Sequence, residues 1–200
     1  MNSFKEGTEA SSPRKVIYSM MVSLDGFIET EDHLIDWSTP DEELHRYFNE
    51  AENEIDIHLY GRRLYTNMAS YWPTADLNAE APDYEIEYAR KWKNQKKIVF
   101  STTLDHVDWN STLVRGNIKE FMEELKLQPG LHMDLGGAGI AASFMEQDLI
   151  DEYRLYIHPI VLGGGTPMFH SLRNRIHLRL VESRAFGSGV VLLRYQPKPT

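Results

Sequence analysis

The sequence predicts an α/β domain with a mixed, mainly parallel β-sheet. Short apolar runs of the kind that are buried on both faces alternate with segments of helical periodicity, which is the pattern of strand–helix–strand units. The end of the chain differs. Two strand-like segments, 176–186 and 190–195, are separated by Gly187-Ser188-Gly189, which is typical of a β-hairpin.

The first half of the chain supplies three of the expected strands and two of the expected helices. The three short, mostly apolar runs that predict buried strands are 15–23, 55–60 and 96–101. The two segments that predict helices are 40–54 and 81–94. The first of these helices opens with Thr39-Pro40, an N-cap followed by a first-turn proline. The stretch 65–77 is weakly patterned and contains Pro73, so we expect a surface loop there.

The second half continues the alternation. A helix is expected at 117–127, where apolar residues recur at i, i+3, i+4 and i+7: Ile118, Phe121, Met122 and Leu125. A strand at 131–135 runs into a glycine-rich turn, and a helix follows through Met145. A long strand is expected at 153–162, interrupted by Pro159 and stopped by three glycines.

Composition excludes several classes of protein. The 200 residues carry 21 basic and 30 acidic side chains, a net charge of -9, which argues against binding to nucleic acid or to anionic lipid. The chain has no Cys, so it has no disulfide, iron–sulfur cluster or Cys-ligated zinc, and we expect a cytoplasmic protein. No apolar run approaches the ~20 residues of a membrane span. Residues 1–14 are polar and predict a disordered leader, with a single domain at 15–200.

Gly136-Gly137-Ala138-Gly139 is the strongest local signal, because it lies between a predicted strand and a predicted helix. Glycines at such a turn let the backbone approach a ligand, and the free N–H groups of the helix attract a phosphate. The pattern is neither G-x-G-x-x-G nor a P-loop. A purely structural turn is the alternative.

Two other strand ends could also contact an anion. Gly61-Arg62-Arg63 directly follows the strand at 55–60, where open α/β sheets bind ligands, and Ser101-Thr102-Thr103 ends the strand at 96–101. The alternatives are a solvated helix start whose arginines pair with Asp or Glu, and a turn built by Ser and Thr.

Acidic residues near the first strand are candidates for proton transfer or substrate contact. Asp25 follows the first strand, and Asp41-Glu42-Glu43 opens the next helix, where the helix dipole favours carboxylates whatever their function. His158 precedes Pro159 in an apolar strand, and we expect it to be packed in the core. No H-E-x-x-H or G-x-S-x-G is present, so we expect neither a metal site nor an α/β-hydrolase.

The order of six motifs along the chain is more specific than any of them alone. They are V-S-L-D-G-F-I, L-Y-G-R-R, K-I-V-F-S-T-T, L-G-G-A-G-I, L-I-D-E and H-P-I-V-L-G-G-G. Over 15–197 this series resembles the dihydrofolate reductase-like superfamily, in particular the reductase domain of the bifunctional riboflavin-biosynthesis deaminase-reductase. The resemblance implies a three-layer fold, with a central mixed sheet of about eight strands, helices on both faces and NADPH bound across the sheet.

The resemblance also implies roles for the cofactor-binding residues. Gly136, Gly137 and Ala138, together with Gly139, would meet the pyrophosphate. Gly61, Arg62 and Arg63 would lie near the phosphates, and Ser101 and Thr102 would face the 2′-phosphate. The chain departs from the family at Leu64, where Thr is frequent, and at Thr102, where Arg is common.

The substrate side departs further. The riboflavin-pathway reductases usually have Lys or Arg at the position of Phe27 and Glu at the position of Leu135. Dihydrofolate reductase has the pattern W-x-x-P-x-[DE], which matches Trp37, Pro40 and Glu42 and places Glu42 at the proton-relay position. We therefore expect Asp25 and Glu42 to contact substrate or deliver a proton. Phe27 and Trp37 would wall the nicotinamide or substrate ring.

The leading hypothesis is an NADPH-dependent reductase that transfers hydride to a small heterocycle or a ribosylaminopyrimidine-like substrate, as 5-amino-6-(5-phosphoribosylamino)uracil reductase does. Three alternatives remain: dihydrofolate reductase activity, a non-catalytic nucleotide-binding member of the fold, and a binder of flavin or another nucleotide. Members of the family often form homodimers, so we expect one here, with the strand at 153–162 and the terminal hairpin offering the surface.

Overall fold

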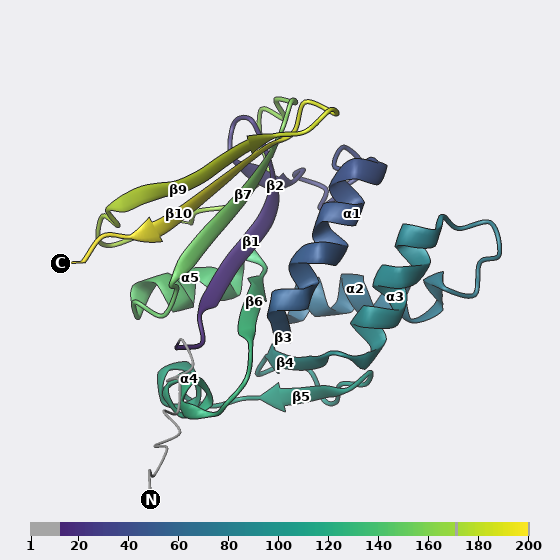
Figure 1. The fold of residues 1–200 in the computed structure, drawn as a ribbon. Coiled ribbons are helices and arrows are strands. Elements are labelled where there is room, and N and C mark those ends of the chain that lie inside the picture. Colours follow the sequence, from purple (N-terminus) through teal and green to yellow (C-terminus); the bar gives the residue numbers. More distant parts are fainter. Residues whose placement is uncertain (1–12, 171, 200) are drawn as a thin grey trace, which may run out of the picture.

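Eight strands form one mixed sheet whose order in space does not follow the chain (Figure 1). The computed structural model describes residues 13–170 and 172–199. From edge to edge the strands are β5 (Ser111–Val114), β4 (Lys96–Phe100), β3 (Ile55–Gly61), β6 (His132–Gly136), β1 (Val16–Ser23), β7 (Glu152–His158), β10 (Val191–Pro197) and β9 (Leu178–Ala185). All neighbours from β5 to β7 are parallel, and β10 is antiparallel to both β7 and β9. The predicted mixed, mainly parallel sheet with a C-terminal hairpin is confirmed.

The central strand β1 explains why its sequence is an unbroken apolar run. Tyr18 lies opposite Leu135 of β6 on one side and Tyr153 of β7 on the other. Val16, Ile17 and Tyr18 have no exposed surface. A strand with a parallel neighbour on each side and helices over the sheet must be apolar on both faces.

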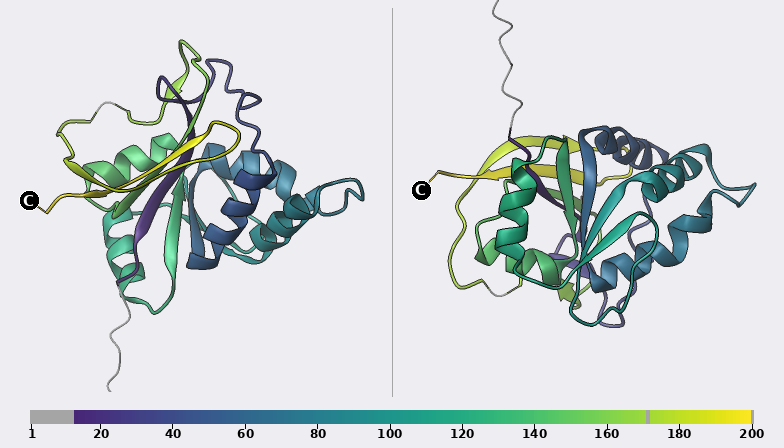
Figure 2. Two further views of the ribbon diagram at one scale, coloured as in Figure 1. Left: turned by 45° about the horizontal axis from the view of Figure 1, so that its top comes forward. Right: turned by 90° about the horizontal axis from the view of Figure 1, so that it is seen from below.

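Helices cover both faces of the sheet (Figures 1 and 2). On one face, α4 (Ile118–Leu127) and α5 (Ala138–Glu146) pack their apolar residues into the core that contains Tyr18 and Leu135. On the other face lie α1 (Glu42–Ala51), α2 (Arg62–Ala75) and α3 (Asp83–Asn94), in two smaller clusters around Tyr60 and Tyr156. The result is the three-layer arrangement that the family resemblance implies.

The expected loop at 65–77 is wrong, because most of it belongs to the helix α2. Tyr65, Met68 and Trp72 pack with Tyr60 and the other residues of one cluster, and this tertiary contact outweighs the weak local pattern. Pro73 lies in the last turn, so its missing N–H and its ring disturb little of the helix.

Several element boundaries also differ from those expected. The strand expected at 153–162 ends at His158, because Pro159 has no N–H to continue the ladder. The helix expected at 40–54 starts at Glu42 and ends at Ala51, and the 3₁₀-turn η1 (Glu52–Glu54) follows. Three short strands were not expected: β5, and the pair β2 (Phe27–Glu29) and β8 (Thr166–Pro167), which forms a second small sheet.

The predicted leader, 1–14, lies outside the described residues except for Pro13 and Arg14. Arg14 is buried, donates to the carbonyl of Leu131 at 2.6 Å and forms an ion pair with Asp56. Arg14 therefore packs against the domain, although it falls within the predicted leader. Within 13–170 and 172–199, no helix combines the length and the apolar character that crossing a membrane requires.

Candidate active site

The structure brings the residues that follow the parallel strands to one edge of the sheet, which we call the carboxyl edge. Register fixes their neighbours: Tyr60, at the end of β3, lies opposite Gly136 of β6, and Gly61 lies opposite Phe100 of β4. Ser23 of β1 lies opposite His158 of β7. The predicted site residues that follow β1, β3, β4 and β6 therefore share the edge at which open α/β sheets bind ligands.

Two helices begin at the carboxyl edge without a side-chain cap. The N-cap residues of α2 and α5 are Gly61 and Gly137, and neither helix has an acidic residue in its first turn. By contrast, Asp41 caps α1 by accepting a hydrogen bond from the amide of Leu44 at 2.9 Å. Uncapped N–H groups and the positive end of the dipole make the starts of α2 and α5 suitable for an anion.

The glycines at this edge differ in whether packing or backbone conformation requires glycine at their positions. A Cβ on Gly136 would overlap the side chain of Leu64, and one on Gly61 would lie 3.3 Å from Ile140, so both glycines let α2 and α5 pack closely. Gly137 has φ +101°, a conformation that favours glycine. At Gly139 a Cβ would meet nothing within 4 Å. The packing of the protein does not require glycine at this position.

Arg62 and Arg63 start α2, where the helix dipole disfavours cations unless an anion is close. Arg63 forms an ion pair with Glu29, a buried carboxylate that also accepts from the Thr166 hydroxyl at 2.5 Å. The charge of Arg63 is thus neutralised within the protein, as expected if the arginines at this helix start pair with Asp or Glu. Arg62 is exposed and makes no side-chain hydrogen bond or ion pair to any described residue. It is the arginine of this pair that remains available to a ligand.

The end of β4 is a turn with a nearby cation. The Ser101 hydroxyl accepts from the amide of Leu104 at 3.1 Å, and Thr102 is exposed. Arg115, which directly follows β5, donates to the carbonyls of Leu104 and Asp105. The sequence interpretation missed Arg115. Because β5 was not predicted, nothing indicated that a residue after it would lie beside Ser101.

Asp25 holds the loop that follows β7. Its carboxylate accepts from the Ser23 hydroxyl at 2.7 Å and from the backbone amides of Gly163 at 2.7 Å and Leu162 at 3.1 Å. Partial desolvation alone would raise the pKa of Asp25, but these hydrogen bonds outweigh it and lower the pKa. A proton donor at neutral pH needs the opposite shift, so the geometry supports a positioning role.

Glu42 lies in the first turn of α1 and is mostly exposed. It accepts a hydrogen bond from Nε of Arg46 at 2.9 Å, and the same guanidinium reaches Asp83 of α3, also at 2.9 Å. The structure thus gives Glu42 an ion-pair partner on its own helix.

The two residues predicted to wall a ring lie beside the ends of β1 and β7. The amide of Phe27 donates to the Ser23 hydroxyl at 2.9 Å. The indole of Trp37 meets the imidazole of His158 edge to face, with centroids 5.5 Å apart and an angle of 90° between the rings. His158 is buried as expected, and burial lowers its pKa. Its contact with Trp37 was not expected.

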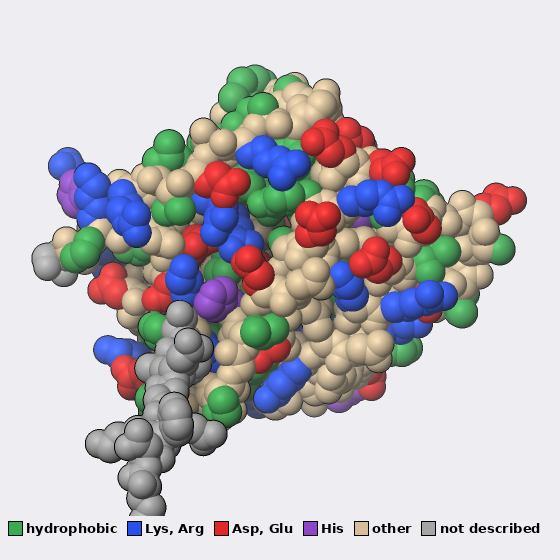
Figure 3. All heavy atoms as spheres, in the orientation of Figure 1, with side chains coloured by type: hydrophobic (Ala, Val, Ile, Leu, Met, Phe, Trp, Pro, Cys, Tyr) green, Lys and Arg blue, Asp and Glu red, His purple; other side chains and the backbone are tan. Residues whose placement is uncertain are grey.

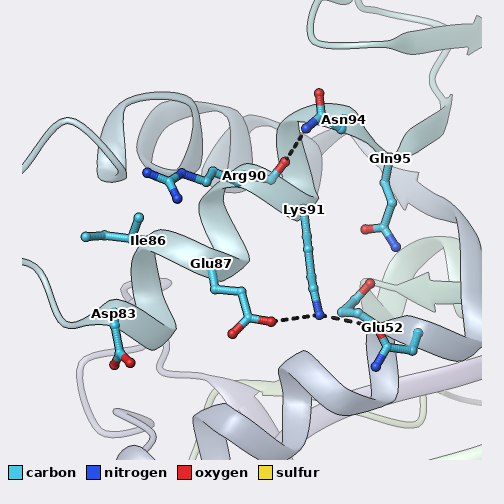
Figure 4. Close-up of a pocket in the computed structure, with 9 residues that line it drawn as sticks. Glu52, Asp83, Ile86, Glu87, Arg90, Lys91, Asn94 and Gln95 are labelled. Carbon is cyan, nitrogen blue, oxygen red and sulfur yellow. Dashed lines mark hydrogen bonds and ion pairs between the residues drawn. The ribbon is translucent and has the colours of Figure 1, made fainter.

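A hollow of about 760 Å³ lies elsewhere, between η1 and α3 (Figure 4). Glu52 and Gln95, which line it, precede β3 and β4, so the hollow is at the opposite end of these strands from the candidate site. Lys91 pairs with Glu87 of the same helix at 3.0 Å and reaches Oδ1 of Asn53 in η1 at 3.4 Å. Acidic and basic side chains are likewise interspersed over the face drawn in Figure 3. Among the residues that the structure describes, no cluster of three or more His, Asp or Glu could hold a metal ion.

The arrangement defines a dihydrofolate reductase-like fold. A dihydrofolate reductase from Enterococcus faecalis, solved in complex with NADP(H), superposes with a TM-score of 0.62 at 14% identity, covering 92% of this chain and 97% of that one. A putative riboflavin biosynthesis protein from Shewanella sp. PV-4 superposes with a TM-score of 0.75 at 22% identity, over 92% and 99% of the two chains.

Within that fold, the chain belongs to the RibD C-terminal domain family, whose sequence model matches residues 14–192. The protein YyaP of Bacillus subtilis (strain 168) is 39% identical over 183 residues, which is 91% of this chain and 94% of that protein. The resemblance inferred from the six motifs is therefore confirmed.

Proposed function

We propose that this protein is an NADPH-dependent reductase that acts on a small heterocyclic substrate of the ribosylaminopyrimidine type. The observation that carries the proposal is the pair of uncapped helix starts at the carboxyl edge, with Arg62 unpaired beside one and Gly139 open in the other. Membership of the RibD C-terminal domain family supports it, and so does the structural likeness to a dihydrofolate reductase that binds NADP(H).

When bound, NADPH supplies the hydride, and the residues of this chain supply orientation and charge. The first turns of α2 and α5, with Arg62, would hold the pyrophosphate. Ser101 and Thr102 would face the 2′-phosphate, and Arg115 beside them would supply the cation that the family often has at the position of Thr102. Phe27 and Trp37 would wall the ring on the other side of the reacting carbon.

Asp25 and Glu42 have different roles in this proposal. Asp25, with its lowered pKa and three hydrogen bonds, would keep the loop after β7 in place beside the substrate. Glu42 would be the proton donor, a role that requires it to exchange its ion pair with Arg46 for a contact with the substrate.

The proposal is tested by nucleotide binding and by turnover. At a concentration about 100 times its dissociation constant, NADPH should stabilise the protein by roughly 2.7 kcal/mol, and NADH should stabilise it less. Oxidation of NADPH should then depend on added 5-amino-6-(5-phosphoribosylamino)uracil, with dihydrofolate as the competing substrate. Failure of both nucleotides to raise the melting temperature would reject the cofactor assignment.

The variant Gly139→Ala tests anion binding by the backbone at the start of α5 without disturbing the fold. The added methyl group has free space in the protein and favours a helix by roughly 1 kcal/mol, so the melting temperature should not fall. If the pyrophosphate lies against this turn, NADPH affinity should fall roughly tenfold or more, since the phosphate loses close contact with the amides. An unchanged affinity would move the cofactor away from α5.

A further inference from the structure

Two buried ring nitrogens on the substrate side have no hydrogen-bond partner among the described residues. They are Nε1 of Trp37 and Nε2 of His158. The two rings touch edge to face, and His158 lies beside Ser23 at the ends of β7 and β1. Both nitrogens are therefore at the carboxyl edge, next to the residues that hold the loop after β7.

Buried polar atoms in folded proteins are almost always hydrogen-bonded, so this pair needs an explanation. Nδ1 of His45 and Nδ1 of His58 also have no hydrogen-bond partner within the described part of the chain, and the latter lies 3.7 Å from a carboxylate oxygen of Asp134. Other ring nitrogens do find partners. Trp92 donates to the Tyr60 hydroxyl at 3.3 Å, Trp72 donates to the sulfur of Met68 at 3.3 Å, and Nε2 of His58 lies 2.7 Å from Oε1 of Gln95. Trp37 and His158 differ from these in that their two rings touch each other at the carboxyl edge.

The chemistry of the two rings defines what they can bind. The indole of Trp37 is only a donor, and a neutral imidazole offers one donor and one acceptor. His158 has no ion-pair partner among residues 13–170 and 172–199, and burial disfavours its charged form. The nearby carboxylate of Asp25 is already engaged by Ser23, Leu162 and Gly163. A donor next to an acceptor matches the adjacent C=O and N–H groups of a lactam.

We propose that Trp37 and His158 recognise the lactam edge of the substrate's heterocyclic ring, with the indole N–H donating to the ring carbonyl and the imidazole accepting from the neighbouring N–H. This inference rests on the proposed reductase function and assigns the recognition of the substrate ring to these two residues. Trp37 lies on the segment that joins β2 to α1, and binding at both nitrogens requires its indole to rotate away from His158. Specificity follows because a ring without the lactam would leave two buried groups unpaired.

The test uses 5,6-diaminouracil as the probe, because it has lactam edges and no phosphoribosyl group. In the presence of NADPH, the probe should shift the indole N–H resonance of Trp37 in a ¹H–¹⁵N spectrum. Tetraaminopyrimidine, in which amino groups replace both carbonyls, should not shift it. Trp37→Phe keeps the aromatic packing and should weaken the probe roughly tenfold, whereas Trp72→Phe should leave its affinity unchanged.

A second measurement separates recognition from a structural role. Trp37→Phe should not lower the melting temperature of the free protein, because the nitrogen that it removes has no partner. If Trp37→Phe loses as much stability as Trp72→Phe does, the indole nitrogen of Trp37 has a structural hydrogen-bond partner in the free protein, such as a bridging water. That result would overturn the inference. Equal binding of both probes would overturn it as well. If the diaminouracil binds through Trp37 but NADPH does not bind, the reductase proposal fails and the recognition site stands.

Discussion

The two ends of the sheet treat polar groups in opposite ways. Near the amino ends of the strands, buried charges are paired: Glu152 accepts from Arg154 at 2.8 Å and from Arg194 at 3.1 Å, and His58 lies 3.1 Å from Glu52. At the carboxyl edge, two helix starts have no side-chain cap, and neither Arg62 nor two buried ring nitrogens have a side-chain partner among the described residues. Polar groups near the amino ends therefore stabilise the fold, whereas the carboxyl edge combines internal pairs, such as Arg63 with Glu29, with groups that are available to a ligand.

This difference shows that a perturbed pKa does not by itself mark the active site of this protein. Burial alone would lower the pKa of His58, but Glu52 and Asp134 outweigh it and raise the pKa to about 10. Burial lowers the pKa of Lys97 to about 8. Both residues lie away from the carboxyl edge, in a region where ion pairs shift the pKa of His58 and burial beside the carbonyls of Trp92 and Gln95 shifts that of Lys97.

The largest expected effect on stability comes from removing a buried carboxylate near the amino ends of the strands. Glu152→Gln keeps the volume of the side chain but leaves Arg154 and Arg194 without their buried carboxylate, which should cost about 3–5 kcal/mol of unfolding free energy. Chemical denaturation measures this cost. NADPH affinity of the folded variant should equal that of the wild type, and a weaker affinity would show that the two ends are coupled.

The same residue predicts a dependence on acid. Burial alone would raise the pKa of Glu152, but Arg154, Gln196 and Arg194 lower it to about 2. Because the folded pKa lies below the unfolded value, the stabilisation is complete above about pH 4.5 and is lost as the pH falls toward 2. Unfolding measured between these pH values should lose about 3 kcal/mol more in the wild type than in Glu152→Gln.

An intermediate effect is expected where α2 packs against the glycine turn. Gly136→Ala would force Leu64 out of its place and should destabilise the protein by about 1–3 kcal/mol. Leu64→Ala should restore part of that loss in the double variant, which a double-mutant cycle measures. Additive effects would contradict the packing role of Gly136.

The smallest effect on stability, together with a clear effect on nucleotide binding, is expected at the carboxyl edge. Arg62→Ala should leave the melting temperature unchanged and weaken NADPH by roughly tenfold, about 1.4 kcal/mol. Arg90→Ala is the matched control, because Arg90 is also exposed but lies on α3 at the far end of the strands. Equal losses of affinity in the two variants would mean that net charge, and not a site, attracts the nucleotide.

Much of this architecture could be predicted because the signals were local. The apolar run of β1, the glycines before α5 and the hairpin turn each depend on a few consecutive residues. The helix α2 could not be predicted in the same way, since its apolar residues are justified by contacts with Tyr60 and Trp92, which lie elsewhere in the chain.

The candidate site shows the same limit. Arg62 and Arg63 are adjacent in sequence and could not be told apart until Glu29, 34 residues away, was seen to neutralise one of them. Arg115 and the contact between Trp37 and His158 likewise depend on pairings between distant segments. A sequence can supply the residue types of a site more readily than it can supply their partners.

The position of β1 in the middle of the sheet has a consequence for how the chain folds. β1 is the first described strand in the sequence, yet Val16 lies opposite Met133, and β7 comes later still. The pair β3 and β4 can form much earlier, because only a few dozen residues separate them. During synthesis, an apolar strand must therefore wait for both of its neighbours, which makes folding slow and exposes it to aggregation. The carboxyl edge, and with it any catalytic capacity, comes into being only when the last of these strands is inserted.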